Sequence, residues 1–191
     1  MDLQYRPYTS TDRDACILLF HTNVPRFFRD HELHDFAEFL DSAECQYYVI
    51  TSGGKTVGCG GFGIQDGNDT ADLCWGIVHN DYHGQRIGEY LLLFRLCEIA
   101  RNSGVRYVRL GTCQHTEGFF QRYGFETQLT IPDGITDGLD DVEMRLELTG
   151  ANRMSGQVVF PPREKISDSS SRQPSISASK PLISRVVVKR P

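Results

Sequence analysis

The chain has 191 residues, of which 39% are hydrophobic and 24% are charged, with a formal net charge of −5 at pH 7. That length and apolar content suit one domain with a buried core and are too small for two. No apolar run approaches the roughly 20 residues of a membrane span, and the first ten residues lack the apolar segment of a secretory signal. We therefore expect a cytoplasmic protein without a membrane partner.

Charge and composition divide the chain near residue 150. Residues 151–191 hold eight basic and two acidic side chains (net +6), whereas residues 1–150 hold 12 basic and 23 acidic ones (net −11). Seven serines fall between positions 167 and 179, and such a segment cannot bury a core. We predict a folded domain over 1–150 and a serine-rich, basic, disordered tail over 151–191. The negative charge of the domain either forms an ordinary solvated surface or attracts cationic ligands, and it disfavours nucleic acid as a partner.

The six cysteines form no C-x-x-C pair, and most of them lie in apolar runs. They are predicted to be small core residues in a reducing compartment, with no metal site and no disulfide framework. They are Cys16, Cys45, Cys59, Cys74, Cys97 and Cys113.

The sequence of the first half of the chain predicts one strand, two helices and then three more strands. Residues 3–6 alternate as a strand, residues 14–20 have apolar side chains at helical spacing, and a second helix should follow Pro25. Strands are predicted over 46–51, 56–64 and 71–78, because these runs are rich in β-branched and aromatic residues and are separated by turn residues. The strand over 56–64 contains four glycines, which predict a bulge or an opening toward a ligand.

The second half begins with a glycine-containing loop and a long helix. The loop over 79–86 leads into a helix over 89–102, whose apolar positions 87, 91, 94 and 97 fit a period near 3.6. A strand over 105–110, a short helix over 116–123 and a strand over 142–148 follow. In the last strand Val142, Met144, Leu146 and Leu148 share one face.

The loop before the long helix predicts an anion site. A helix N-terminus offers unpaired backbone N–H groups and a partial positive charge, and Gly84 and Gly88 allow a bulky anion to approach the backbone. Arg86 adds a cation at its edge. The P-loop and Rossmann fingerprints are both absent from the sequence.

Two motifs give the chain a family resemblance. The first is HGQRIGEYLL, which begins at residue 83, and the second is GFFQRYGFE, which begins at residue 118. Together with the order of helices and strands before them, these motifs make residues 1–149 resemble the GNAT superfamily. The motifs of that family read [QR]-x-x-G-x-[GA] and F-Y-x-x-x-G-F. The resemblance implies an α+β fold with a mostly antiparallel central sheet of six or seven strands flanked by helices. It also implies one splayed parallel pair, over 71–78 and 105–110.

The resemblance further implies an N-acetyltransferase that uses acetyl-CoA as co-substrate, without a metal. The acceptor, a small-molecule or peptide amine, would attack the thioester directly, and a backbone N–H of residues 75–78 would steady the oxyanion. Alternatives are a non-catalytic acyl-CoA-binding or regulatory module on the same fold, and an unrelated interaction scaffold. The implied cofactor-binding residues are Ile77, Val78, His83, Gly84, Gln85, Arg86, Ile87, Gly88, Thr116 and Phe120.

Three positions depart from the family pattern. His83 replaces Gln or Arg, and Arg86 replaces the first motif glycine. A negative φ is expected at Arg86, because only its backbone amide is needed at the anion site. Phe120 stands where many members carry a tyrosine that is proposed to protonate the thiolate. A thiolate, with a thiol pKa of ~8.5, leaves tolerably without such an acid.

Asp72 is the candidate catalytic base. In the subgroup that acetylates histones, a glutamate lies eleven residues before the first motif position, which corresponds to residue 72 here. The alternative is an exposed acid at the start of a strand. We expect no structural role for Asp72.

Overall fold

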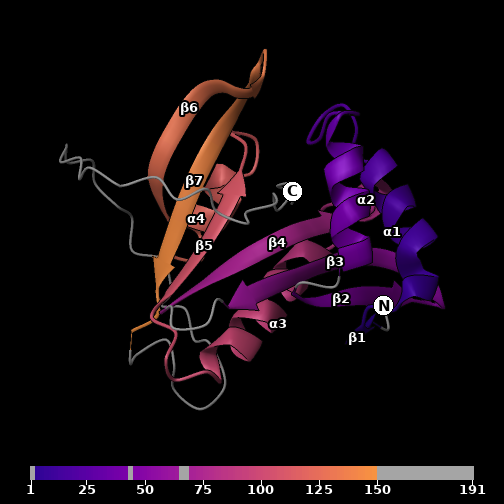
Figure 1. Cartoon of the computed structure of the whole chain (residues 1–191), viewed down its shortest axis with the longest axis horizontal. Helices are drawn as coiled ribbons and strands as arrows, with labels where there is room; N and C mark the ends of the chain where they lie inside the picture. The colour runs from indigo at the N-terminus through magenta and orange to yellow at the C-terminus, as the bar shows by residue number, and fades with distance from the viewer. Residues whose placement is uncertain (1–2, 43–44, 65–68, 150–191) are drawn as a thin grey trace.

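The computed structural model describes residues 3–42, 45–64 and 69–149, and the predicted tail lies outside this part of the chain. One seven-stranded sheet runs through the molecule in the order β1-β2-β3-β4-β5-β7-β6 (Figure 1). The strands are β1 (Leu3–Pro7), β2 (Gln46–Ser52), β3 (Lys55–Ile64), β4 (Thr70–Val78), β5 (Tyr107–Thr112), β6 (Glu126–Thr136) and β7 (Leu139–Glu147). All neighbours are antiparallel except β4 and β5. The predicted α+β fold with a mostly antiparallel sheet is confirmed.

Helices cover both faces of the sheet. They are α1 (Arg13–His21), α2 (Glu32–Ser42), α3 (Ile87–Ala100) and α4 (Glu117–Gln121), with 3-10 turns η1 (Ser10–Asp12) and η2 (Asn80–Tyr82). α1 and α2 bury Leu19 and Phe36 in one cluster with Trp75 of β4. α3 and α4 contribute Leu92 and Phe119 to a second cluster. None of the helices in the described part of the chain is long and apolar enough to cross a membrane.

The parallel pair β4–β5 separates after three residues. Thr70, Ala71 and Asp72 pair with residues 107–109, and beyond Asp72 β4 has no recorded partner on that side. The predicted splayed pair is therefore present, with β5 two residues later than expected. This opening is where the two sheet halves part in Figure 1.

A bulge in β4 lies within the opening. Cys59 pairs with Ile77 and Gly61 pairs with Cys74, so Trp75 and Gly76 together face the single residue Gly60. Trp75 has φ 37°, a left-handed value that an L-residue adopts only under strain. A Cβ on Gly60 would lie 3.1 Å from both the Gly76 Cα and the Leu91 Cδ2. The bulge predicted for the glycine-rich strand thus lies in its neighbour β4, and glycine in β3 allows both the bulge and α3 to approach closely.

Three local differences from the sequence-based prediction have physical causes. α2 begins at Glu32 rather than soon after Pro25, because residues 22–27 and 30–31 form turns, and Phe28 between them is still buried. The buried face of α3 is centred on Leu92, Arg95 and Leu96, and Phe94 and Cys97 lie at its half-exposed margin. β6 was not predicted, because Pro132, Asp133 and Gly134 interrupt its pattern; its position at the sheet edge tolerates them.

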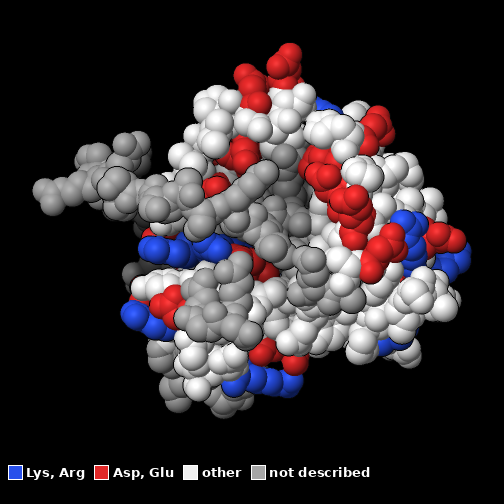
Figure 2. Space-filling view, in the orientation of Figure 1, with Lys and Arg blue, Asp and Glu red and all other residues white. Residues whose placement is uncertain are grey.

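Acidic side chains gather on two separate elements. Figure 2 shows red surface over α2 and over the tip of the β6–β7 hairpin. The exposed acids of α2 are Asp35, Glu38 and Asp41, and the acids near the hairpin tip are Asp133, Asp137, Asp140 and Asp141. The negative charge predicted for residues 1–150 therefore lies partly on the face that carries α1 and α2.

Candidate functional site

The loop between β4 and α3 has an unusual backbone. Gly84 has φ 79° and Arg86, the N-cap of α3, has φ 63°. The two left-handed residues turn the chain sharply into the helix. Because α3 is 14 residues long, its first N–H groups carry the full partial charge of a helix N-terminus.

The expectation of a negative φ at Arg86 was wrong. The backbone at Arg86 has a conformation that glycine adopts freely and that costs about 1–2 kcal/mol for a residue with a Cβ. The Arg86 side chain folds back on the first turn, where Nε and Nη2 donate to Glu89 at 2.7 and 3.0 Å. The side chain of Arg86 thus helps to hold a left-handed backbone at the start of α3.

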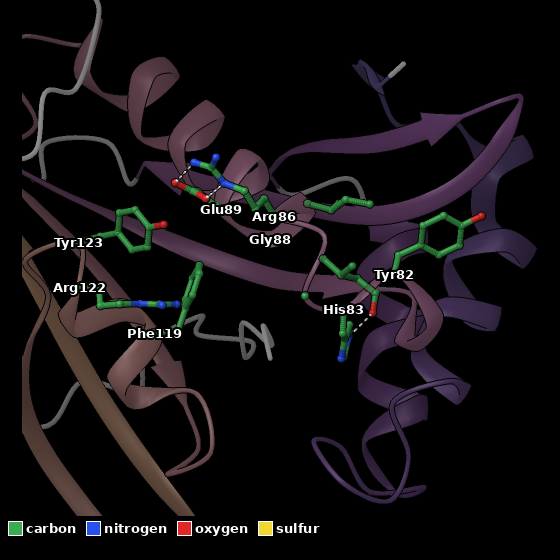
Figure 3. A pocket seen from close by; sticks show the side chains of 11 residues that line it. Tyr82, His83, Arg86, Gly88, Glu89, Phe119, Arg122 and Tyr123 are labelled. Atoms are coloured by element: carbon green, nitrogen blue, oxygen red, sulfur yellow. Dashed lines mark hydrogen bonds and ion pairs between the residues drawn. The ribbon is translucent and has the colours of Figure 1, made fainter. Parts of the chain in front are cut away.

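A pocket of about 250 Å³ lies between this loop and α4. Figure 3 shows His83, Gly88 and Arg86 on one side and Phe119, Arg122 and Tyr123 on the other. Its lining residues are Val78, Tyr82, His83, Gly84, Arg86, Ile87, Gly88, Glu89, Phe119, Arg122 and Tyr123.

Two arginines place positive charge at the pocket. The Arg122 guanidinium lies 5.2 Å from the centre of the Phe119 ring, and its Nε is buried without a hydrogen-bond partner among the described residues. Arg86 is bound to Glu89, and this hydrogen bond lowers the pKa of that carboxyl group. Burial raises the pKa of the Tyr123 phenol to about 12. Arg122 therefore has donor capacity left for an anion, which fits a phosphate group.

His83 is held at the end of β4. Its Nε2 lies 2.8 Å from the Val78 carbonyl oxygen, and since a carbonyl can only accept, this nitrogen carries the proton. Asn23 Nδ2 donates to the same oxygen at 2.9 Å. The Phe27 ring lies edge-on to His83, with 5.6 Å between ring centroids, and also contacts His115. These contacts connect the loop to the α1 side of the opening.

The structure brings six of the ten predicted cofactor-binding residues together at the pocket. They are Val78, His83, Gly84, Arg86, Ile87 and Gly88. Gln85 is exposed and donates to the Asp81 carbonyl. Ile77, Thr116 and Phe120 are buried away from the pocket lining.

α4 presents a different residue to the pocket from the one predicted. Phe120 is fully buried with Phe125, whereas Phe119 lines the pocket. Sequence reasoning also missed Tyr82, Glu89, Arg122 and Tyr123. Helical spacing was the available signal, because Phe119, Arg122 and Tyr123 lie three and four residues apart and so share one face.

Asp72 has a structural role that was not expected. It is 4% exposed, and both of its carboxylate oxygens accept from Arg109, at 2.8 and 3.1 Å. The two residues face each other in the last recorded pair of β4 and β5. The ion pair therefore ties these strands together where they begin to separate. Burial and the bidentate ion pair together leave an amine little access to either oxygen of Asp72.

The comparison with protein families gives a match over part of the chain. Residues 43–127 match the family model described as an acetyltransferase (GNAT) domain. No curated protein matches the chain in sequence. The matched range contains β2 to α4 and so includes the whole pocket.

Solved structures share the fold at low sequence identity. The ribosomal-protein-S18-alanine N-acetyltransferase from Escherichia coli is 19% identical with a TM-score of 0.65, and the alignment covers 79% of this chain and 98% of that one. An aminoglycoside 6'-N-acetyltransferase complexed with coenzyme A is 16% identical, with a TM-score of 0.63 and coverage of 85% and 100%. The PaiA N-acetyltransferase from Thermoplasma acidophilum in complex with coenzyme A is 16% identical, with a TM-score of 0.57 and coverage of 78% and 100%.

Proposed function

We propose that the protein moves an acetyl group from acetyl-CoA to an amine. Residues 43–127 match the GNAT acetyltransferase domain, and the chain shares the fold of GNAT structures. The observation that carries the proposal is the pocket between the β4–α3 loop and α4. It combines a helix N-terminus, a left-handed cap and an arginine with a free donor. Coenzyme A carries phosphates that such a site would bind.

The geometry of the pocket supports a binding role for several residues. The first N–H groups of α3 and the Arg122 guanidinium would hold the phosphates, and Gly88 leaves room beside the helix backbone. Phe119 and Ile87 supply apolar surface for the rest of the ligand. Arg86 shapes the loop and contributes less charge, because Glu89 already accepts from it.

The opening between β4 and β5 would hold the reacting group. Beyond Asp72 the β4 edge that faces β5 has no recorded strand partner. Two carbonyls in this stretch are already satisfied, since Tyr47 Oη donates to Trp75 O at 2.8 Å and Asn23 donates to Val78 O. We assign the oxyanion to a backbone N–H of residues 75–78, which would be fixed in place by the bulge.

The acceptor would approach from the α1–α2 side. Most amines are cations at neutral pH, and the acids of α2 and of the β6–β7 tip on this side attract them. The amine must lose a proton before it attacks, and water is the proposed acceptor because Asp72 is buried and paired with Arg109. The acceptor class is a small-molecule or peptide amine.

A non-catalytic acyl-CoA-binding module is the second candidate. It is favoured by Phe120, which has no hydroxyl group and is fully buried, so this position supplies no acid to a departing thiolate. Transfer without an acid remains chemically feasible, since a thiol pKa of ~8.5 makes the thiolate a tolerable leaving group.

Thiol release from acetyl-CoA, measured across a panel of amines, distinguishes the candidates. Acetyl transfer predicts that at least one amine accelerates thiol release and gains the mass of an acetyl group. A protein that is stabilised by acetyl-CoA in a thermal-shift assay but turns over none of the panel would support the binding module. Absence of both effects would contradict both candidates.

A further inference from the structure

Two thiols that are distant in sequence meet beside the sheet. Cys45, which precedes β2, and Cys74 of β4 have their Sγ atoms 2.9 Å apart. Both are free thiols. Cys45 is half-buried, whereas Cys74 is only 2% exposed. The pair therefore joins one thiol within reach of solvent to a second thiol in the core.

A glycine makes this contact possible. Gly61 of β3 pairs with Cys74 in the sheet, and Cys45 lies over it from the other side. A Cβ on Gly61 would lie 3.1 Å from Cys45 Sγ and 2.4 Å from the Gln46 carbonyl oxygen. Because Gly61 has no side chain, the two sulfur atoms meet across β3 although β2 and β4 are not neighbours.

The surroundings favour reaction of these thiols over the others. Cys45 borders a surface hollow of about 270 Å³ that Tyr8, Phe39 and Tyr48 also line, and a small reagent can reach it there. The fully buried Arg95 donates from Nη1 to the Gly61 carbonyl oxygen at 3.4 Å. Its positive charge opposes the effect of burial, which raises the pKa of the Cys74 thiol. Partial exposure therefore distinguishes Cys45 from the buried Cys74, and the 2.9 Å contact gives the accessible thiol a partner.

We propose that Cys45 and Cys74 form a reversible oxidation site that a hydroperoxide converts into an intramolecular disulfide. The Cys45 thiolate attacks a peroxide oxygen, which breaks the O–O bond and leaves Cys45 as a sulfenic acid. The alkoxide or hydroxide that departs takes up the proton of the original thiol. The Cys74 sulfur then attacks the Cys45 sulfur, an S–S bond forms, and the S–O bond breaks with loss of water that carries the Cys74 proton. Two thiols are oxidised and one peroxide is reduced.

The disulfide would restrain a part of the chain that matters to the opening. It links positions 29 residues apart and so removes freedom from the unfolded chain. Cys74 directly precedes Trp75 in the bulge, and Tyr47, two residues after Cys45, donates to the Trp75 carbonyl. The oxidised protein should therefore unfold at a higher temperature than the reduced one. The inference does not depend on acetyl transfer, and its test needs no acetyl-CoA.

The test treats the reduced full chain with stoichiometric hydrogen peroxide, alkylates the remaining thiols and maps the peptides. The expected result is loss of two of the six thiols, recovery of the Cys45 and Cys74 peptides as one linked species, and restoration by dithiothreitol. Cys97→Ser, at another half-buried cysteine, should behave as wild type. Cys45→Ser should form no disulfide.

Several outcomes would overturn the proposal. They are Cys45 found mainly as sulfinic or sulfonic acid, a disulfide between two chains, or a linkage that uses Cys97. Wild-type mapping decides the question even if a cysteine variant folds poorly. In Cys74→Ser, if it folds, a dimedone adduct on Cys45 should accumulate because the resolving thiol is missing.

Discussion

Replacement of Arg86 tests whether the loop has the glycine-like backbone described here. The residue has φ 63° at the N-cap of α3. At such a position glycine avoids a cost of about 1–2 kcal/mol that any residue with a Cβ incurs. Arg86→Gly and Arg86→Ala both remove the contact with Glu89, so their difference isolates the backbone. Arg86→Gly should be more stable than Arg86→Ala because it avoids this cost. The expected difference is only about 1 kcal/mol, since glycine also adds freedom to the unfolded chain and so offsets part of the gain.

Thermal unfolding monitored by circular dichroism measures this difference. For a chain of this size 1 kcal/mol corresponds to about 2–4 °C in Tm. Gln85 is the control, because it is exposed and has no positive φ; there the glycine variant should be less stable than the alanine variant. If Arg86→Ala equals or exceeds Arg86→Gly in stability, the left-handed cap is not present in solution.

Three further predictions concern single side chains. Asp72→Asn should lose about 1–3 kcal/mol of stability in urea unfolding, because Arg109 loses a charged acceptor; a wild-type midpoint would show that the strand tie is unimportant. Arg122→Ala should weaken coenzyme A binding about tenfold or more in calorimetry with little change in Tm. Arg101→Ala, at the far end of α3, should bind as wild type, and equal effects of the two variants would show a general charge effect. Asp12 accepts hydrogen bonds from an arginine that lower its pKa to about 2. Since the unfolded value is ~3.9, the stability that Asp12 adds over Asp12→Asn should be complete above about pH 4 and should disappear as the pH falls toward 2. A gap that grows in acid would reverse the sign of this linkage.

Regular patterns in the sequence were sufficient for most of the fold. The strand ending in Leu148 alternates apolar and polar residues, and the structure buries Val142, Met144 and Leu146 on one face as predicted. β6 was missed because it lies at the sheet edge, exposes Leu129 and Ile131, and carries Pro132, so it has no apolar alternation to detect. Periodicity identifies buried faces, and an edge strand has little buried face to identify.

The site was predictable where the backbone determines it and less predictable where side chains do. The loop glycines and the start of α3 followed from the motif, and the structure places Gly84 and Gly88 at the pocket. The choice between Phe119 and Phe120 depends on how α4 is rotated, which five helical residues cannot specify. The role of Asp72 depends on Arg109, which lies 37 positions away along the chain, and no local spacing reveals that partner.

Calorimetric titration of acetyl-CoA tests the central claim, that the β4–α3 loop and α4 form its binding site, most directly. Gly88 is buried in the first turn of α3 and lines the pocket, so Gly88→Glu would place a bulky anion beside the amides that are proposed to hold the phosphates. We predict that the wild-type chain binds at one site per protein, and that Gly88→Glu lowers the affinity by at least about a hundredfold, or ~2.7 kcal/mol, while circular dichroism still shows a folded protein. Unchanged affinity in the folded variant, or no binding to the wild type, would contradict the account.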